Sequence, residues 1–295
     1  DLSILMPYSA DPHSFEASPQ DAIKIADADI VFYVGLKYES ANLVELLENS
    51  VASADKLIEI GPSINPIEFS EEGHDDDDDH DGHDDHEGHG HDDDKHKDDD
   101  DDHDGHDDHE GHGHGIYDPH FWFDPIRVSM AVEVIKDELV KFDTTNQSSY
   151  GSAASDYVQK LEALDASLTA MIDTIPAENR KIITTHESLG YLEARYGIEV
   201  LTTIIPSLNS EDGMTLQSLK KAIDVIEDNH IEVMFLEAET SSQYSKTIEQ
   251  ETGIRLVSGL WVETLQENQS YEEWLESNVN IIVSNLPLEV HEDED

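Results

Sequence analysis

The sequence predicts an α/β protein in which strands and helices alternate in each half of the chain. Short apolar runs are followed by segments with helical spacing, and this rhythm occurs once in the first half and again in the second. A third observation is one long helical pattern, Gln147–Ile175, between the two halves. Each half is therefore expected to fold as parallel strands covered by helices.

In the N-terminal half, short apolar strands alternate with helices that have recognisable starts. Ser18 and Pro19 fit the cap and the first position of a helix. Gly35 stops the second strand, which is expected to be buried. The predicted strands are Leu2–Met6, Ile30–Val34 and Leu57–Ile60, and the predicted helices begin at Ser18 and span Glu39–Asn49.

After the middle of the chain the helices become longer. Pro125 opens a helix whose inward face carries Val128, Ala131, Val132, Ile135 and Leu139. The pattern Gln147–Ile175 keeps its apolar residues at steps of three and four throughout. At ~1.5 Å per residue this helix is about 40 Å long, enough to run the length of two domains. Beyond it we predict strands at Lys181–Thr185, Ile198–Ile204, Ile231–Leu236 and Ile254–Val257, and helices at Leu189–Tyr196, Thr215–Asn229, Ser245–Thr252 and Tyr271–Leu286.

A His/Asp-rich tract, residues 71–115, interrupts the first half. The string DDDDDHDGHDDHEGHGH occurs at Asp75–His91 and again at Asp98–His114, and the tract holds no apolar residue to bury. Burial therefore cannot offset the entropy of ordering this segment, and we predict that it is disordered. Imidazoles among carboxylates bind cations weakly. The candidate accessory metal ligands are His74, His80, His83, His86, His89, His91, His96, His103, His106, His109, His112 and His114.

Composition excludes several classes of function. The formal net charge is −53, and −32 remains when the tract is left out, so nucleic acid and anionic membrane surfaces are not expected as ligands. The chain has no Cys, which excludes disulfides and thiolate metal sites. No run reaches the ~18–20 apolar residues that span a bilayer. Asp1 leads straight into Leu2–Met6, so we expect that a leader has been removed or lies outside this chain.

Five histidines lie outside the tract, and three of them share a context. His13, His120 and His186 each lie near a predicted strand end, in the loop before a helix. The carboxyl ends of parallel strands meet at one edge of a sheet, where ligands bind. These three residues therefore predict a metal site. His230 ends a helix and His291 lies in a polar tail, so both are expected to be solvated.

A cation bound by three neutral imidazoles needs a carboxylate as its fourth ligand. Glu263 follows a short apolar run, and Glu237 and Glu239 follow the strand that ends at Leu236. Glu237 has an alternative role, which is to orient a histidine ring from behind. Spacing alone does not choose between these carboxylates.

Six pieces of sequence match a known family in order. They are ADPHSFE at Ala10–Glu16, ADADIV at Ala26–Val31, DPHFWFDP at Asp118–Pro125, TTHESLGYL at Thr184–Leu192, FLE at Phe235–Glu237 and LWVETL at Leu260–Leu265. With these pieces the chain resembles the metal-binding solute-binding proteins of ABC transporters, the group that serves zinc, manganese and iron. The resemblance covers nearly the whole chain except the tract and the tail.

The resemblance implies two α/β lobes joined by one long helix, with the metal in the cleft. The lobes would be residues 1–143 and 176–288, the connecting helix 144–175 and the acidic tail 289–295. It implies the ligands His13, His120, His186 and Glu263, with Glu237 or a water as the alternative fourth ligand. Many members have Asp where this chain has the longer Glu263. The family's first strand and helix are expected to be missing from this chain.

The resemblance further implies a zinc-binding component of an ABC transporter, which is monomeric and not an enzyme. It would capture Zn²⁺ outside the cytoplasm and deliver it to a membrane permease with its ATPase. Three imidazoles favour Zn²⁺ over Mn²⁺ or Fe²⁺, and affinity should fall in acid as the rings become protonated. The alternatives are a zinc buffer acting through the tract, a manganese- or iron-binding member of the family, and a zinc hydrolase with Glu187 as base.

Overall fold

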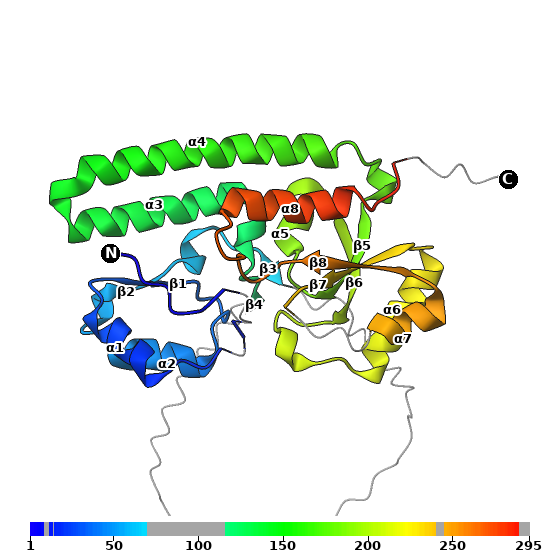
Figure 1. Cartoon of the computed structure of the whole chain (residues 1–295), viewed down its shortest axis with the longest axis horizontal. Coiled ribbons are helices and arrows are strands. Elements are labelled where there is room, and N and C mark those ends of the chain that lie inside the picture. Colours follow the sequence, from blue (N-terminus) through cyan, green and yellow to red (C-terminus); the bar gives the residue numbers. More distant parts are fainter. Residues whose placement is uncertain (9–11, 14, 70–115, 240–244, 289–295) are drawn as a thin grey trace, which may run out of the picture. The chain divides into compact units, whose positions relative to one another are not determined.

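Pairs of short parallel strands with helices beside them form the α/β architecture that the sequence predicts (Figure 1). The computed structural model describes residues 1–8, 12–13, 15–69, 116–239 and 245–288. The predicted disordered tract and the predicted acidic tail lie outside these residues. Within the described ranges, no helix combines the length and the apolar character that crossing a membrane requires.

The first helix, α1 (Pro19–Asp27), begins where the sequence predicts. The Ser18 side chain accepts the N–H of Asp21, and the Asp21 carboxylate accepts the N–H of Ser18. This reciprocal pair satisfies two donors at the helix start. The following elements are β1 (Val31–Tyr33), α2 (Ala41–Ser50), η1 (Ala54–Lys56), β2 (Leu57–Glu59) and η2 (Gly61–Ser63), and β1 pairs with β2 in parallel.

Two predictions for this part of the chain are wrong. Leu2–Met6 is not a strand, and the side chains of Leu2 and Ile4 are 91% and 61% exposed. An apolar run becomes a strand only where its backbone groups find a partner strand, and β1 and β2 pair with each other instead. The strand at Ile30–Val34, expected to be buried, is half-buried because, among the described residues, β1 has β2 as its one partner strand.

A short antiparallel pair lies on either side of the tract and was not predicted. In it β3 (Glu68–Phe69) pairs with β4 (Ile116–Tyr117), and Phe69 lies opposite Ile116. The Tyr191 hydroxyl joins both flanks, because it accepts the N–H of Ile67 at 3.2 Å and donates to the carbonyl of Asp118 at 2.7 Å. The chain thus leaves and re-enters the described fold at neighbouring points, shortly before His120.

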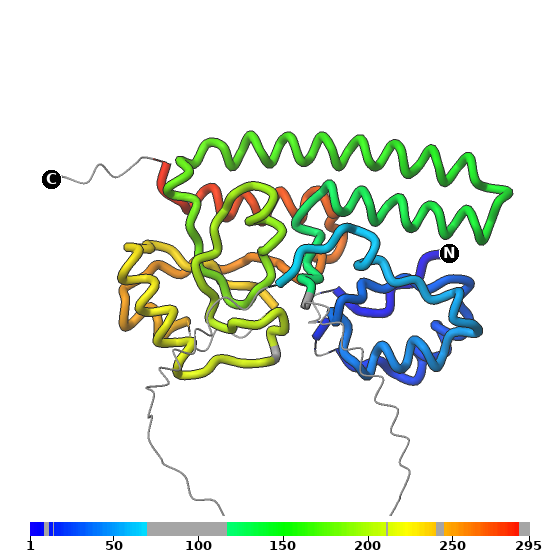
Figure 2. Tube along the Cα trace, turned by 180° about the vertical axis from the view of Figure 1, so that it is seen from behind, coloured from blue at the N-terminus to red at the C-terminus, as the bar shows by residue number. Residues whose placement is uncertain are grey.

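The long helical pattern forms α4 (Gln147–Ile172), which packs along α3 (Pro125–Phe142) and against α8 (Tyr271–Val283) (Figures 1 and 2). The turn η4 (Thr144–Asn146) joins α3 to α4. The helix ends at Ile172 rather than Ile175, because the chain turns before Pro176 and η5 (Ala177–Asn179) follows. On its buried face α4 carries Ala154, Leu161, Leu164, Leu168 and Ile172.

The C-terminal part contains two more parallel pairs. In one, β5 (Lys181–His186) pairs with β6 (Glu199–Ile205), and in the other β7 (Val233–Glu237) pairs with β8 (Arg255–Leu260). Contacts between β5 and β7 bring the two pairs together. Gly259, with a φ of 110°, allows the bulge in which Glu237 lies opposite Leu260. The remaining elements are η3 (Phe121–Phe123), α5 (Gly190–Tyr196), η6 (Ser210–Asp212), α6 (Leu216–Asp228) and α7 (Ser245–Thr252).

Two clusters of buried residues form the core. The larger one joins the N-terminal part, α4 and the C-terminal part, with members such as Ile64, Phe123, Leu168, Phe235 and Trp274. The smaller one lies among the C-terminal strands, α6 and α7. Because the larger cluster is continuous, the strand ends of both parts are fixed relative to one another. The division into lobes at residues 143 and 175 stays a prediction, since the described residues before and after the tract form one compact unit.

Candidate metal centre

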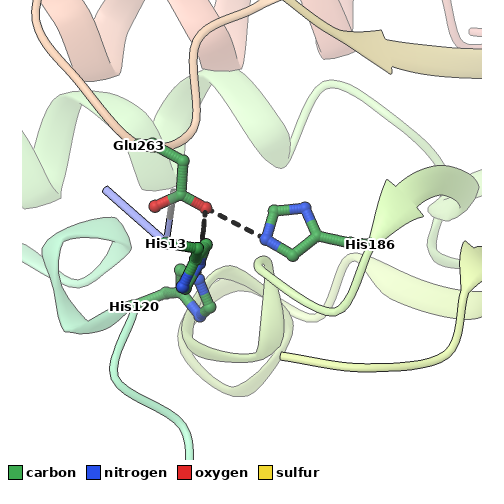
Figure 3. A group of neighbouring side chains, drawn as sticks. All are labelled: His13, His120, His186 and Glu263. Carbon is green, nitrogen blue, oxygen red and sulfur yellow. Dashed lines mark ion pairs between the residues drawn. The ribbon is translucent and has the colours of Figure 1, made fainter. Parts of the chain in front are cut away.

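Four segments far apart in the sequence bring the predicted ligands together (Figure 3). His13 lies in the loop before α1, and His120 is the residue directly before η3, after β4. His186 is the last residue of β5, and Glu263 follows the end of β8. All four residues are buried, with exposed fractions between 0% and 8%.

The carboxylate of Glu263 lies among the three imidazole rings. Its Oε1 atom is 3.0 Å from Nε2 of His186, 3.4 Å from Nε2 of His120 and 3.7 Å from Nε2 of His13. One candidate ligand atom from each residue lies within 4.8 Å of the other three. The four side chains therefore converge on a single point, as their proposed role as ligands requires.

Two of the three rings each have a further carboxylate on the side away from Glu263. Asp118 Oδ1 is 2.7 Å from Nδ1 of His120 and also accepts that residue's backbone N–H at 2.9 Å. Glu237 Oε2 is likewise 2.7 Å from Nδ1 of His186, and Glu237 Oε1 accepts its backbone N–H at 3.0 Å. A carboxylate at Nδ1 holds the proton there and turns the Nε2 lone pair towards the centre. Glu237 thus has the orienting geometry that was the alternative to its being a ligand.

Several buried atoms at the centre lack a hydrogen bond within the described residues. They are Nε2 of His120, Nε2 of His186 and both carboxylate oxygens of Glu263. Buried polar atoms without partners are costly and call for an explanation. A cation held by imidazole nitrogens and a carboxylate oxygen would satisfy them, and this donor set suits tetrahedral coordination.

The charges of the cluster favour a bound cation. Burial lowers the pKa of His120, but the carboxylates of Glu263 and Asp118 outweigh it and raise this pKa to about 9. Burial also lowers the pKa of His186, but the carboxylates of Glu237 and Glu263 outweigh burial and raise this pKa well above its usual value. Burial would raise the pKa of Glu263, but the histidines, His120 foremost, hold it well below its usual range. Protons and metal cations therefore compete for the same nitrogens.

Two aromatic residues that the sequence analysis did not single out close the centre on one side. The Tyr38 ring lies edge-on to His13, with ring centroids 5.4 Å apart, and the Trp122 ring lies edge-on to His120 at the same distance. Their packing contributes to the burial of His13 and His120. Asp118 was also missed as a functional residue, although its place two residues before His120 is a usable signal. The sequence offers no signal for Tyr38.

An acidic pocket of about 780 Å³ opens beside His13. Its lining includes the carboxylates Glu39, Glu45, Glu48 and Glu59. Negative charge in a concave surface raises the local concentration of cations. The pocket therefore gives His13 an electrostatically favourable approach from outside.

The other singled-out residues are not among the four that converge, or they lie outside the described residues. His230 is exposed after the end of α6, as expected. Glu187, considered as a base for a hydrolase, accepts a hydrogen bond from the Thr203 hydroxyl at 2.9 Å. Glu239 does not join the four converging residues; its carboxylate accepts backbone N–H groups near Glu263. The tract histidines and His291 lie outside the described residues.

Comparison with known proteins agrees with the resemblance. The model of the family described as zinc-uptake complex component A, periplasmic (ZnuA), matches residues 1–285. The chain belongs to this family. The ZnuA family consists of substrate-binding transport proteins, so the hydrolase alternative is wrong and the chain is not an enzyme. Its place in the family makes it a metal-binding component of an ABC transporter.

Individual relatives carry different metals in their names. The zinc uptake protein ZnuA of Bacillus subtilis is 27% identical, over 97% of this chain and 81% of the relative. The manganese-binding lipoprotein MntA of Halalkalibacterium halodurans is 24% identical over the same shares of the two chains. The iron-binding protein YfeA of Yersinia pestis is 25% identical, over 94% of this chain and 75% of the relative.

Solved structures agree on the fold. The periplasmic zinc binding protein TroA from Treponema pallidum superposes with a TM-score of 0.74 and 18% identity, covering 95% of this chain and 88% of that chain. A manganese-bound periplasmic metal binding protein from Candidatus Liberibacter asiaticus gives 0.72 and 23% identity, covering 95% and 89%. At these identities the likeness shows that the chain shares the fold of these two periplasmic metal binding proteins.

Proposed function

We propose that this protein captures one Zn²⁺ outside the cytoplasm and delivers it to a membrane permease that works with an ATPase. The ligands are His13, His120, His186 and Glu263, and Glu237 orients His186. The observation that carries the proposal is the convergence of three imidazole Nε2 atoms on the carboxylate of Glu263. The protein acts as a monomer, and the ion is its cargo.

Zinc is proposed over manganese and iron because of the donor set. Imidazole nitrogen suits Zn²⁺, whereas Mn²⁺ prefers carboxylate and carbonyl oxygen. One carboxylate and three imidazoles in a buried centre fit the four-coordinate geometry of zinc. Manganese and iron stay the second candidates, since relatives of similar identity are named for them.

The ligands are proposed to come in pairs from two lobes, residues 1–143 and 176–288, with the helix 144–175 between them. His13 and His120 belong to the first lobe, and His186 and Glu263 to the second. Since α4 packs along both α3 and α8, large movements of the lobes are restricted. Release is therefore proposed to occur through local movement of the ligand-bearing loops when the protein docks on the permease.

The test is the metal content and zinc affinity of three proteins: the full chain, the variant His120→Ala and a variant lacking residues 74–114. We expect the full chain to hold one ion against a competing chelator, and mass spectrometry to identify it as zinc. The deletion variant should keep this one tight ion. His120→Ala should lose it, because an imidazole ligand and its charge balance are removed.

The buffer alternative gives the opposite pattern. If the tract carried the function, deletion of residues 74–114 would remove nearly all zinc binding and His120→Ala would remove little. Tight binding of manganese in preference to zinc by the deletion variant would overturn the choice of metal while leaving the site in place.

A further inference from the structure

The segment Trp261–Thr264 carries Glu263 beyond the end of β8, and side chains bond its backbone. The Asn278 side chain bonds both backbone groups of Trp261. The Oδ1 atom of Asn278 accepts the N–H of Trp261 at 2.9 Å, and its Nδ2 atom donates to the carbonyl of Trp261 at 2.7 Å. The carbonyl of Val262 accepts the indole N–H of Trp122 at 2.7 Å. The segment is thus held by contacts from other parts of the chain rather than by a neighbouring strand.

The Tyr38 hydroxyl donates to the carbonyl of Glu263 at 3.4 Å, and Glu239, which follows β7, bonds the N–H groups of the segment. Its carboxylate accepts three successive backbone N–H groups, those of Val262 at 3.4 Å, Glu263 at 3.2 Å and Thr264 at 3.3 Å. The bonds to Glu263 and Thr264 go to the same oxygen, Oε1. Successive N–H groups that point to one side form a concave anion-binding surface, and here a side chain of the same protein fills it.

We propose that Glu239 is a positioning residue, which fixes the backbone at Glu263 so that the carboxylate reaches the three histidines. This inference rests on the proposed function, because it treats Glu263 as a ligand. Glu239 does not touch the converging atoms and acts only through the segment that carries Glu263.

The length of the Glu263 side chain explains why its backbone must be fixed. A glutamate has three rotatable bonds between its Cα atom and its carboxylate, so small changes at the backbone move its oxygens widely. Trp122 and Asn278 hold the two residues before Glu263, and the Tyr38 hydroxyl donates to the Glu263 carbonyl, but Glu239 is the described side chain that bonds the N–H of Glu263 itself. Without it, the three N–H groups would lose their acceptor and the segment would gain freedom.

The test compares Glu239→Ala and Glu239→Gln with the full chain and with Asp143→Asn. Asp143 is a matched control, because its carboxylate also accepts two backbone N–H groups, but at the turn between α3 and α4. Three properties are measured: zinc dissociation into excess chelator, the visible spectrum of the Co²⁺-loaded proteins, and hydrogen exchange of the amides of Val262, Glu263 and Thr264. A His120→Ala chain supplies the contribution of the tract to the cobalt spectrum.

We expect Glu239→Ala to release zinc about 10- to 100-fold faster, as is typical when an outer partner of a ligand is removed. Its cobalt spectrum should lose tetrahedral intensity as water replaces the carboxylate, and the three amides should exchange faster. Glu239→Gln keeps one acceptor oxygen and should show a smaller change in the same direction. It also keeps the test open if Glu239→Ala does not fold. Asp143→Asn should match the full chain.

The inference is overturned if both Glu239 variants match the full chain in dissociation and spectrum. It is also overturned if their amides exchange faster while zinc release and the cobalt spectrum stay unchanged, since Glu239 would then serve the fold alone. Failure of the full chain itself to bind one Zn²⁺ or Co²⁺ more tightly than His120→Ala would instead refute the proposed function.

Discussion

His120 depends on a carboxylate that is not itself among the converging atoms. Asp118 bonds both the ring nitrogen Nδ1 and the backbone N–H of His120, so it fixes the ring's tautomer and its direction together. Asp118 is in turn held through its carbonyl by the buried Tyr191 hydroxyl. Its side chain is buried and leaves little room for another arrangement.

Replacing Asp118 by Asn should weaken zinc binding by about 10- to 100-fold, because the neutral amide no longer stabilises the Nδ1 proton as strongly. Affinity is measured by competition with a chromophoric chelator. The control is Asp137→Asn, the same change on the exposed side of α3, which should leave affinity unaltered. Equal affinities for the two variants would contradict the orienting role.

At this scale the sequence predicted the four converging residues, but not the contacts around them. Short motifs that are recognisable in the sequence contain His13, His120, His186 and Glu263. The positioning contacts of Glu239 and the packing of Tyr38 join segments far apart in the sequence, such as Tyr38 and His120. No local pattern records such pairs, because they arise only when the strand ends meet.

The start of α1 shows how side chains define the ends of an element. Asp21 accepts bonds from the Lys24 ammonium and from the hydroxyl and N–H of Ser18. These bonds, that from Lys24 foremost, lower the pKa of Asp21 to about 2. The ionised form is therefore the one that the folded protein favours, and the charge also complements the helix dipole.

Replacing Asp21 by Asn should lower the free energy of unfolding by about 0.3–1 kcal/mol near neutral pH. Because the folded-state pKa lies below the unfolded one, this contribution is present above about pH 4 and is lost as the pH falls towards 2. Urea unfolding of both proteins across this range measures the difference. A difference that stayed constant down to pH 2 would show that the charge of Asp21 is not its source.

Elements with strong local signals were predicted well, and weak ones were not. Helices with a polar cap or a glycine stop begin or end close to the predicted residues, as α1, α5 and α7 do. The pair β3 and β4 has two residues in each strand, which is too short for any periodic pattern. Leu2–Met6 failed in the opposite way, because its apolar pattern is real but has no partner strand in the described fold.

For the whole molecule, the dominant physical property is its charge. The formal net charge of −53 attracts divalent cations from a distance, and the acidic pocket beside His13 lies where such a cation would approach. The converging atoms themselves are buried, so salt screens them much less than it screens the surface. Capture and retention of the ion should therefore respond differently to ionic strength.

Zinc capture should slow at least about tenfold when NaCl is raised from about 0.01 M to 1 M, as the screening length falls from about 30 Å to about 3 Å. Dissociation into chelator should change little over the same range. Both rates are measured by stopped-flow fluorescence, with Trp122 beside His120 as the reporter. Sucrose at matched osmolality is the control. A capture rate that does not depend on salt would mean that long-range attraction plays no part.

The pairing of β3 with β4 affects how far the segment that connects these two strands can change in length. Phe69 and Ile116 are opposite each other, and the Tyr191 hydroxyl bonds both flanks, so contacts among the described residues hold the two points of departure together. Doubling the length of a connecting segment adds only about 0.6 kcal/mol to the cost of closing it. The segment between Phe69 and Ile116 can therefore be lengthened, shortened or replaced in sequence. His120, four residues after Ile116, would keep its place.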